Sequence, residues 1–356
     1  MSSDASTPLI LGIETSCDET AAAVVRGGVE VLSNVIATQH ELHEEYLGVV
    51  PEIASRAHLE RLLPVLRKAM NCAGVEWREL DAIAVGHRPG LIGSLLVGVS
   101  AAKALAWSLD KPLLGVDHIV AHLQGGLLNE DPATYPAMGL VVSGGHTSLF
   151  HLTGPTDIRL LGRTIDDAIG EAYDKAAALL HLGYPGGPKL DELAADGDEH
   201  AVKLPVADLG RDRLDYSFSG LKTALLYAVR GRPTGHGKSA DFERDSRDLS
   251  EQQRADFAAS FQRAAVTAIL RNLNRALDQH NVFSLLVGGG VSANSKLRKE
   301  LQHIAVDRGL DLRLPPLEYC LDNAAMIAGY AAHRYKAGLF DDLSLTASTQ
   351  TELTSR

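Results

Sequence analysis

Two stretches of similar pattern decide the fold: LILGIETSCDETAAAVV at residues 9–25 and AMGLVVSGGHTSLFHL at residues 137–152. In each, an apolar run ends in a polar tip and a second apolar run follows, which predicts two strands joined at that tip. A glycine-containing turn and a third apolar run come next, at 26–36 and at 154–162. The chain therefore contains the same three-stranded meander twice.

A strand, a glycine-rich loop and a helix are also predicted twice, at residues 80–109 and 282–301. The loops read GHRPGLIG at 86–93 and GGGVSAN at 288–294. In each half this unit follows the meander, although few residues are identical between the halves. The repeated order indicates an architectural duplication, so we expect an α/β fold with two similar lobes that face a nucleotide cleft.

The composition restricts the class of protein. The chain has 356 residues, 45% of them hydrophobic, and a formal charge of −11. This charge has the wrong sign for a protein that coats nucleic acid by itself, although it is compatible with a basic patch or a basic partner. No apolar run is long and charge-free enough for a membrane span, and no signal peptide is apparent. The three cysteines form no disulfide pattern, so we expect a cytoplasmic location.

The motif DHIVAH at residues 117–122 carries two histidines four positions apart. It follows an apolar run at 113–116, so we expect a strand that leads into a helix with His118 and His122 on one face. Such a pair binds a metal ion, or it is two polar residues at a helix start, one of them capping or hydrogen-bonded. Asp322, which opens the last helix, offers a third ligand. Two histidines and one carboxylate leave coordination positions free, as in catalytic divalent-metal sites.

Four glycine- or hydroxyl-rich loops end predicted strands, at residues 14–20, 86–93, 143–147 and 288–294. In an α/β cleft, such loops converge at the carboxyl ends of the strands and bind a ligand. Their backbone amides, and the helix starts that follow some of them, suit phosphate groups. For the first loop taken alone, a solvated hairpin turn explains the residues at least as simply.

Together these motifs resemble those of the tRNA threonylcarbamoyladenosine transferase family in its bacterial form. The resemblance runs in family order over residues 9–340, nearly the whole chain. The matching stretches are GIETSCDETA (12–21), GVVPEIASRAH (48–58), RPGLIGSLLVG (88–98), DHIVAHL (117–123), LVVSGGHT (140–147), DDAIGEAYDKAA (166–177), YPGGPKLD (184–191), YSFSGLKTA (216–224), GGGVSANSKLR (288–298) and EYCLDNAAMIA (318–328). Any one of them is modest evidence, and the combination is highly specific.

The resemblance implies the actin/Hsp70-like fold, with duplicated α/β lobes around an interlobe nucleotide cleft. Residues 8–117 and 324–341 would form the N-terminal lobe, and residues 118–323 the C-terminal lobe. The remaining segments are polar and expected to be mobile: an insertion at 230–250 and tails at 1–7 and 342–356.

The resemblance also implies a reaction, the transfer of a threonylcarbamoyl group from threonylcarbamoyl-AMP to N6 of adenosine 37 in tRNAs that read ANN codons. A divalent metal, Fe²⁺ in preference to Zn²⁺, would be held by His118, His122 and Asp322. The residues that would contact the adenylate are Val142, Ser143, Gly144, Gly145, His146, Asp174, Gly187, Asp191 and Asn294. Asp18 and Glu19 would orient or deprotonate the attacking amine, or else only hold the turn or a water molecule.

The partners implied by the resemblance are tRNA, a paralogous dimerisation partner, a small ATPase and a separate synthase that supplies the adenylate. No membrane is involved. In one departure from the family pattern, the chain reads HRPGL at 87–91 where bacterial relatives read GPGL. Arg88 adds charge and bulk there, for a contact with a tRNA phosphate or with an acidic side chain.

Two other functions fit the same fold: an ATP-dependent O-carbamoyltransferase and a nucleotide-regulated scaffold of the Hsp70 or actin type. The histidine pair and Asp322 favour carbamoyl chemistry. The sequence lacks the acylphosphatase and zinc-finger segments of the hydrogenase-maturation carbamoyltransferases. A zinc protease is excluded because Ile119, and not a glutamate, follows the first histidine.

Overall fold

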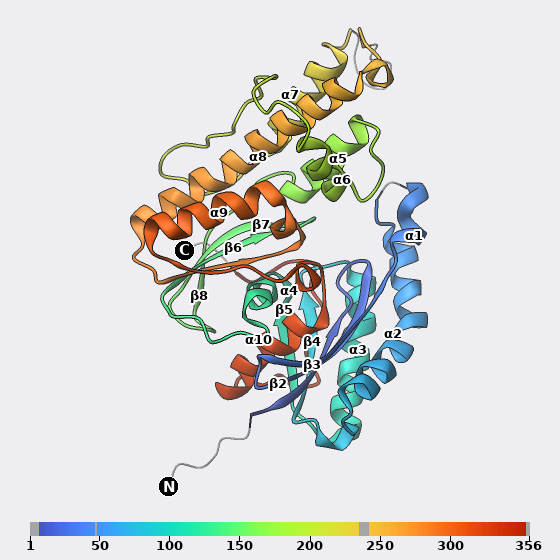
Figure 1. Ribbon diagram of the computed structural model, residues 1–356. Coiled ribbons are helices and arrows are strands. Elements are labelled where there is room, and N and C mark those ends of the chain that lie inside the picture. Colours follow the sequence, from blue (N-terminus) through green and yellow to red (C-terminus); the bar gives the residue numbers. More distant parts are fainter. Residues whose placement is uncertain (1–6, 47, 235–241, 354–356) are drawn as a thin grey trace.

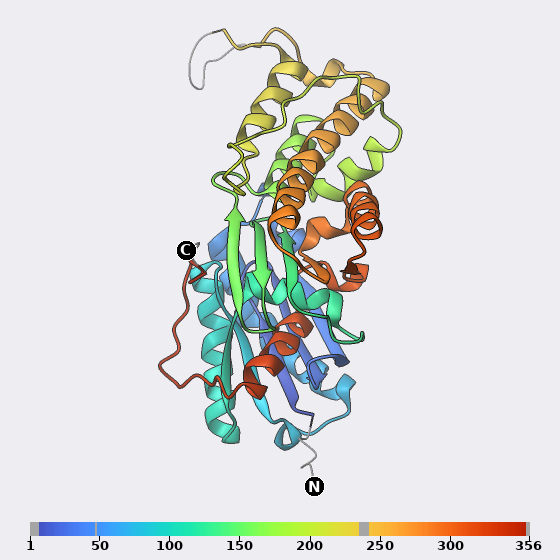
Figure 2. The same cartoon turned by 90° about the vertical axis from the view of Figure 1, so that its left-hand side faces the viewer.

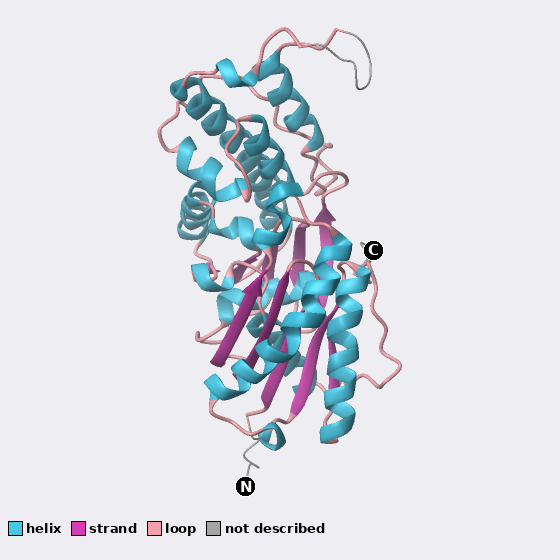
Figure 3. Ribbon diagram, turned by 90° about the vertical axis from the view of Figure 1, so that its right-hand side faces the viewer, coloured by secondary structure: helices cyan, strands magenta, loops and turns pink. Residues whose placement is uncertain are grey.

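The computed structural model describes residues 7–46, 48–234 and 242–353. It has two lobes, each built on a five-stranded sheet (Figures 1 and 3). The first sheet has the strand order β3-β2-β1-β4-β5 and the second β10-β9-β6-β7-β8. The first contains β1 (Leu9–Glu14), β2 (Glu19–Arg26), β3 (Glu30–Thr38), β4 (Ala82–Arg88) and β5 (Leu113–Asp117). The second contains β6 (Ala137–Val142), β7 (Thr147–Leu152), β8 (Ile158–Arg163), β9 (Ser284–Gly288) and β10 (Asp311–Arg313).

Strand pairing is the same in both sheets. Strands β1, β2 and β3 form an antiparallel meander, and β4 and then β5 join β1 in parallel. Strands β6, β7 and β8 form the second meander, and β9 and then β10 join β6 in parallel. The predicted duplication is therefore confirmed for the meander and the strand that follows it, and it extends to β5 and β10, which were not part of the predicted repeat.

Most helices begin or end at a residue that satisfies their free backbone groups. Ser250 and Gln253 form a capping box at the start of α8, and Asn294 and Asn323 cap α9 and α10. Gly74, with φ of 66°, ends α2 in the left-handed conformation. The α-helices are α1 (His40–His43), α2 (Pro51–Ala73), α3 (Ile92–Leu109), α4 (His118–Ala121), α5 (Ile169–Leu179), α6 (Gly186–Ala194), α7 (Ser219–Arg230), α8 (Glu251–Gln279), α9 (Ser295–Arg308) and α10 (Ala324–Lys336). The 3-10 helices are η1 (Glu44–Tyr46), η2 (Trp77–Glu79), η3 (His122–Leu127), η5 (Ser246–Asp248), η6 (Gly290–Ala293) and η7 (Leu317–Tyr319).

The helices form layers on the sheets, and one short segment is shared by both lobes. Helices α2 and α3 cover one face of the first sheet and α10 covers the other, while α5, α7 and α8 pack on the second sheet. Helix α4 and η3 (residues 118–127) lie between the lobes. Ala121 joins the core around α10, whereas Ile119, Leu123 and Leu127 join a core on the second sheet. This shared segment begins with the DHIVAH motif.

The expectation that no segment is apolar enough for a membrane span is wrong for helix α3. Among the described residues, Ile92–Leu109 is long and apolar enough by length and composition. It packs against β4 and α2, and its Leu95, Val99 and Ala102 are buried in the lobe. A core helix of a globular lobe meets the same criteria of length and composition, so this one finding is weak evidence of a span.

The C-terminal segment differs from the expected loose tail. Residues 342–353 lie along the first lobe, where Leu345 and Ala347 pack on the core under α3 (Figure 2). The composition is polar, but a few apolar side chains at the right positions are enough to dock the segment. The expected mobile insertion at 230–250 lies partly outside the described residues, as do nearly all of residues 1–7. Next to the gap, the Arg230 guanidinium carbon lies 4.2 Å from the centre of the Phe242 ring.

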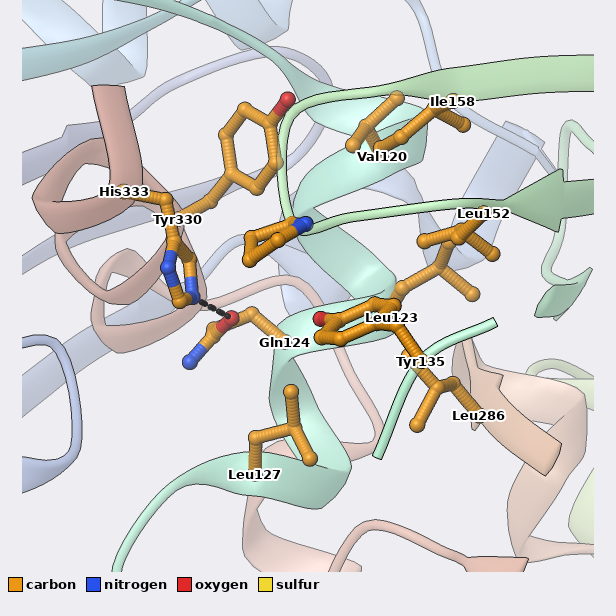
Figure 4. Close-up of a pocket in the computed structure, with 11 residues that line it drawn as sticks. Val120, Leu123, Gln124, Leu127, Tyr135, Leu152, Ile158, Leu286, Tyr330 and His333 are labelled. Atoms are coloured by element: carbon orange, nitrogen blue, oxygen red, sulfur yellow. Dashed lines mark hydrogen bonds between the residues drawn. The ribbon is translucent and has the colours of Figure 1, made fainter. Parts of the chain in front are cut away.

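A small apolar pocket separates α10 from η3 and the second sheet (Figure 4). His333 lies in its wall beside Tyr330, and its Nε2 is 3.2 Å from Gln124 Oε1. Burial, assisted by the charge of Lys336, lowers the pKa of His333 to about 4. An unfolded histidine has a pKa near 6.5, so between these values the unfolded chain binds the proton more readily.

We therefore expect His333 to destabilise the fold as the pH falls from about 6.5 towards 4. Replacing it by glutamine (His333→Gln) removes this proton uptake. The loss in free energy of unfolding between pH 7 and pH 5 should then be smaller in the variant by about 2 kcal/mol. Urea unfolding at both pH values measures it, with exposed His303→Gln as the control. Equal losses in wild type and His333→Gln would contradict the prediction.

Candidate functional site

The start of α4 places two histidines side by side. Strand β5 ends at Asp117, whose Oδ1 accepts a hydrogen bond from the backbone N of Ile119 at 3.0 Å and so begins the helix. His118 and His122 follow one turn apart, and their ring centres are 4.7 Å from each other. Both residues are buried. The predicted helix after a strand is confirmed, although α4 is only one turn long and continues as η3.

Asp322 reaches the histidines from the far end of the chain. It lies just before the cap residue of α10, with its Oδ1 3.5 Å from His118 Nε2 and 3.3 Å from His122 Nε2. These three residues form a group whose ligand atoms all lie within 4.8 Å of one another. The structure thus brings together the three ligands that the sequence predicts.

The chemistry of this group fits a divalent metal. Among the described residues, His122 Nδ1 is buried without a polar partner, and His122 Nε2 has only the 3.3 Å contact with Asp322 Oδ1, which lacks the geometry of a hydrogen bond. A buried polar atom without a partner costs about 1–3 kcal/mol, which coordination of a metal by one of these nitrogens offsets. Two imidazole nitrogens and one carboxylate oxygen are ligands that Zn²⁺ and Fe²⁺ accept.

Glu14, at the end of β1, supports the first histidine. Its Oε2 lies 3.0 Å from His118 Nδ1, and Ser16 Oγ lies 3.2 Å from the same nitrogen. When Nδ1 carries a proton, it donates a hydrogen bond to the Glu14 carboxylate, and Nε2 is left to face Asp322 and a metal. From the sequence, Glu14 is expected in the first loop with no role of its own. Its position directly after the apolar run at 9–13 is the sequence signal for a buried carboxylate at the end of a strand.

The charges around the histidines attract a cation. Burial opposes the charged form of His118, but the carboxylates of Asp322 and Glu14 outweigh it and raise its pKa to about 9. Burial also opposes ionisation of Asp322, yet the two histidines lower the pKa of Asp322. Burial lowers the pKa of His122 and lowers that of His146 to about 3. A divalent ion supplies the positive charge that the proton on His118 otherwise supplies.

The turn after β6 lies next to this group. The His146 ring centre is 6.5 Å from that of His118, and the turn is closed by a hydrogen bond from Ser143 N to His146 O. Gly144 and Gly145 are exposed, and a Cβ added to either would meet no atom within 4 Å. Val142 lies directly behind, where its carbonyl oxygen would be 2.4 Å from a Cβ on Gly289. The turn at 143–146 and the glycine loop at 288–294 therefore lie beside the metal group, that is, the group of His118, His122 and Asp322.

The other predicted adenylate contacts fall into two pairs. Asp174 Oδ1 accepts a hydrogen bond from Gly186 N at 2.8 Å, and the open Gly187 follows directly. Asp191 accepts hydrogen bonds from the backbone and the hydroxyl of Ser295, which is next to Asn294. Each pair joins α6 to another helix, α5 in the first case and α9 in the second.

The side chain of Asn294 forms hydrogen bonds within the protein. Its Nδ2 donates to Gln262 Oε1 at 2.8 Å, and its Oδ1 accepts from Leu297 N at 2.9 Å. The side chain of Asn294 thus caps α9 and also joins it to α8. The backbone of Asn294 is bonded as well, because its N donates to Val291 O and its O accepts from Arg298 N. The second N–H of Nδ2 is therefore the donor of Asn294 that remains to meet a ligand.

Asp18 and Glu19 form a second polar group with His40. The His40 Nε2 lies 3.4 Å from Glu19 Oε1 and 3.8 Å from Asp18 Oδ2. Burial and the neighbouring charge of Asp18 raise the pKa of Glu19 to about 9. The ring centre of His40 lies 6.2 Å from that of Tyr184, just before α6. The polar group at the tip of the first meander therefore lies near the start of α6 in the second lobe.

Comparison with known proteins assigns the family. The family model described as "tRNA N6-adenosine threonylcarbamoyltransferase" matches residues 30–329. The chain belongs to this family. A relative of that name from Symbiobacterium thermophilum is 51% identical over 340 residues, which cover 95% of each chain. Another from Trichlorobacter lovleyi is 49% identical over 340 residues, which cover 96% of this chain and 95% of the relative.

Solved structures that resemble this member of the family share its fold at low sequence identity. HypF from T. kodakarensis has a TM-score of 0.61 and 17% identity, over 94% of this chain and 48% of HypF. The (R)-2-hydroxyglutaryl-CoA dehydratase component A from Acidaminococcus fermentans has a TM-score of 0.51 and 15% identity, over 92% and 99% of the two chains. These likenesses concern the fold alone. They agree with the expected two-lobed fold of the actin/Hsp70 kind.

The contact between Glu14 and His118 yields a test. Replacing the carboxylate by an amide (Glu14→Gln) removes the negative acceptor that orients the imidazole. We expect the affinity for Co²⁺ or Zn²⁺ to fall about 10- to 100-fold, as for other carboxylates that support a metal-binding histidine. Competition with a chromogenic chelator measures it.

The control for this prediction is Glu19→Gln, which changes a buried carboxylate of the same tip that does not contact His118. It should leave the metal affinity within about twofold of wild type. Unchanged affinity in Glu14→Gln would show that His118 is oriented without Glu14.

Proposed function

We propose that this member of the family transfers the threonylcarbamoyl group from threonylcarbamoyl-AMP to N6 of adenosine 37 in tRNAs that read ANN codons. The observation that carries the proposal is the convergence of His118, His122 and Asp322 beside the open glycine turn at 143–146. A metal group next to accessible backbone amides suits a substrate that carries both a phosphate and a carbonyl oxygen. No feature of the described residues favours the alternative carbamoyltransferase or scaffold.

The residues around the turn bind the adenylate in this proposal. The backbone of Gly144 and Gly145 approaches the phosphate or the carbonyl, because no side chain stands in the way. Val142, Ser143 and His146 shape the same turn. Across from it, Asp174 and Asp191 accept hydrogen bonds from ribose or threonyl hydroxyl groups. Gly187 leaves room for the ligand, since an added Cβ there would meet no atom within 4 Å, and Asn294 donates the second N–H of its amide.

The reaction exchanges one bond for another at the carbamoyl carbon. The N6 amine of adenosine attacks this carbon, a C–N bond forms, and the bond to the phosphate oxygen breaks as AMP leaves. The proton lost by the amine passes to Asp18, beside Glu19, whose raised pKa keeps that carboxyl protonated. When bound by His118, His122 and Asp322, an Fe²⁺ or Zn²⁺ ion supplies Lewis-acid stabilisation of negative charge on the substrate oxygens. The protein contributes the orientation of amine and acyl group.

Reconstitution tests the function. The full chain is combined with unmodified tRNA, threonine, bicarbonate, ATP, the synthase, the paralogous partner and the small ATPase. Nucleoside mass analysis should then show threonylcarbamoyladenosine at position 37. In His118→Ala we expect product formation to fall at least about 100-fold, because one of three metal ligands is lost.

Exposed His303→Ala serves as the matched control and should retain the wild-type rate. If wild type yields no modified adenosine with any combination of partners, the proposed function is wrong. If His118→Ala retains the wild-type rate, the role of the metal group is wrong although the function stands.

Partners compensate for the charge of the chain in this proposal. At −11, the chain repels the tRNA backbone on average, so a partner that carries positive charge would strengthen tRNA binding. The paralogous partner, the small ATPase and the separate synthase are therefore part of the proposed system. All of these components act in the cytoplasm.

We place the paralogous partner on the outer face of α2 and α3. The helices touch closely, since a Cβ on Gly93 would lie 2.5 Å from Ser55 Oγ. Near this contact, each helix exposes two large apolar side chains one turn apart. They are Leu59 and Leu63, exposed by 68% and 53%, and Ile92 and Leu96, exposed by 48% and 51%. Large apolar side chains exposed on two packed helices are typical of a protein interface.

Leu63→Asp should therefore weaken binding of the paralogous partner at least about tenfold, because a charge is buried in the interface. Titration calorimetry with the purified partner measures the change. The matched control is Val306→Asp on α9, where the side chain is 81% exposed on the other lobe. Equal affinity in wild type and Leu63→Asp would show that the partner does not bind at this face of α2 and α3.

A further inference from the structure

Residues 341–353, the C-terminal strap, run along the open edge of the first sheet. Strand β5 is the edge strand of that sheet. Asp341 forms a bridge with Leu113, and its Oδ2 accepts a hydrogen bond from Gly115 N at 2.7 Å. Further on, Leu345 packs over Gly115, where an added Cβ would lie 2.8 Å from its Cδ1. The strap therefore covers backbone groups that an edge strand otherwise leaves unpaired.

The strap then crosses the end of β4. His87 O accepts a hydrogen bond from Ser348 N at 3.0 Å, and His87 Nδ1 lies 3.0 Å from Thr346 O. These contacts bring the strap to the ends of the two parallel strands that point towards the metal group. Leu353 packs on the apolar cluster that contains Ile119 of α4.

The last part of the strap contacts Asp117, the residue before the first metal ligand. Thr351 Oγ1 donates a hydrogen bond to Asp117 Oδ2 at 2.6 Å. Arg88 lies between the strap and Asp117, in an ion pair with Glu352 and with its Nε 3.7 Å from Asp117 Oδ2. The Arg88 side chain is 17% exposed, so it faces acidic side chains rather than solvent.

The two carboxylate oxygens of Asp117 have different tasks. Oδ1 accepts from Ile119 N and fixes the first turn of α4, while Oδ2 is held by Thr351 and Arg88. A rotation of this carboxylate would break the cap and shift the helix start. Packing into both cores holds the later part of this segment, so the Asp117 carboxylate acts on the first turn of α4, where His118 lies.

We propose that the strap is a positioning device, in which Thr351 and Arg88 hold Asp117 and thereby direct His118 and His122 at Asp322. The inference rests on the metal site of the proposed function. It also explains the departure at position 88, where bacterial relatives are expected to carry glycine. An arginine there reaches the strap, and glycine does not.

Metal binding by the full chain tests this proposal, with Co²⁺ as the probe because its visible absorption reports ligand geometry. Thr351→Val removes the hydroxyl and keeps the shape of the side chain. We expect it to lower Co²⁺ affinity about 3- to 10-fold and to change the absorption spectrum, while Thr351→Ser restores both. Arg88→Gly should act in the same direction and gives a second measurement should Thr351→Val fold poorly.

Two controls separate positioning from stability. Ser344→Ala changes a hydroxyl of the strap that bonds only to Asp342 among the described residues, and it should retain wild-type affinity. The Tm of every variant is measured in EDTA. If Thr351→Val and Arg88→Gly bind Co²⁺ as wild type does, or if affinity falls only in step with Tm in all variants, the proposal is overturned. If wild type itself does not bind Co²⁺, the proposed metal site has failed instead.

Discussion

The structure depends on the placement of one short segment, α4 with η3, between two sheets. Its apolar side chains enter the cores of both lobes, so the segment can neither rotate nor slide without exposing buried surface on one side. Close packing of the backbone adds to the constraint, because a Cβ on Gly288 would lie 2.1 Å from His122 O. The polar residues of the segment consequently have fixed positions. A metal group needs ligand positions held to within a fraction of an ångström, and the packing provides this.

Burial strengthens the interactions between the charges of the same group. Glu14 and Asp322 are two carboxylates beside two histidines, and in the protein interior their charges are screened far less than in water. One proton on His118 balances only part of the negative charge. Binding of a divalent ion would balance it more fully and give one nitrogen of His122 a partner, which would couple metal binding to folding stability.

The sequence allowed the main architecture and the ligands to be predicted, because both leave repeated or matched patterns. The double meander follows from alternating apolar runs and polar tips, and the ligands follow from the DHIVAH spacing together with a carboxylate before the last helix. Glu14 was missed because a single buried carboxylate has no periodicity. The strap was missed because its contacts come from isolated residues, such as Leu345 and Thr351, in a polar stretch. The bond from Asn294 to Gln262 joins two helices that are adjacent only in space.

The path of the chain between the sheets has a consequence for the unfolded state. The chain leaves the first sheet after β5, builds the whole second sheet, and returns to the first at α10. His118 stands at the departure and Asp322 at the return. An ion shared by these residues closes the entire second lobe into one loop, as a disulfide would. Such a link removes more chain entropy as the enclosed loop grows, so an ion bound there would act as a long-range cross-link.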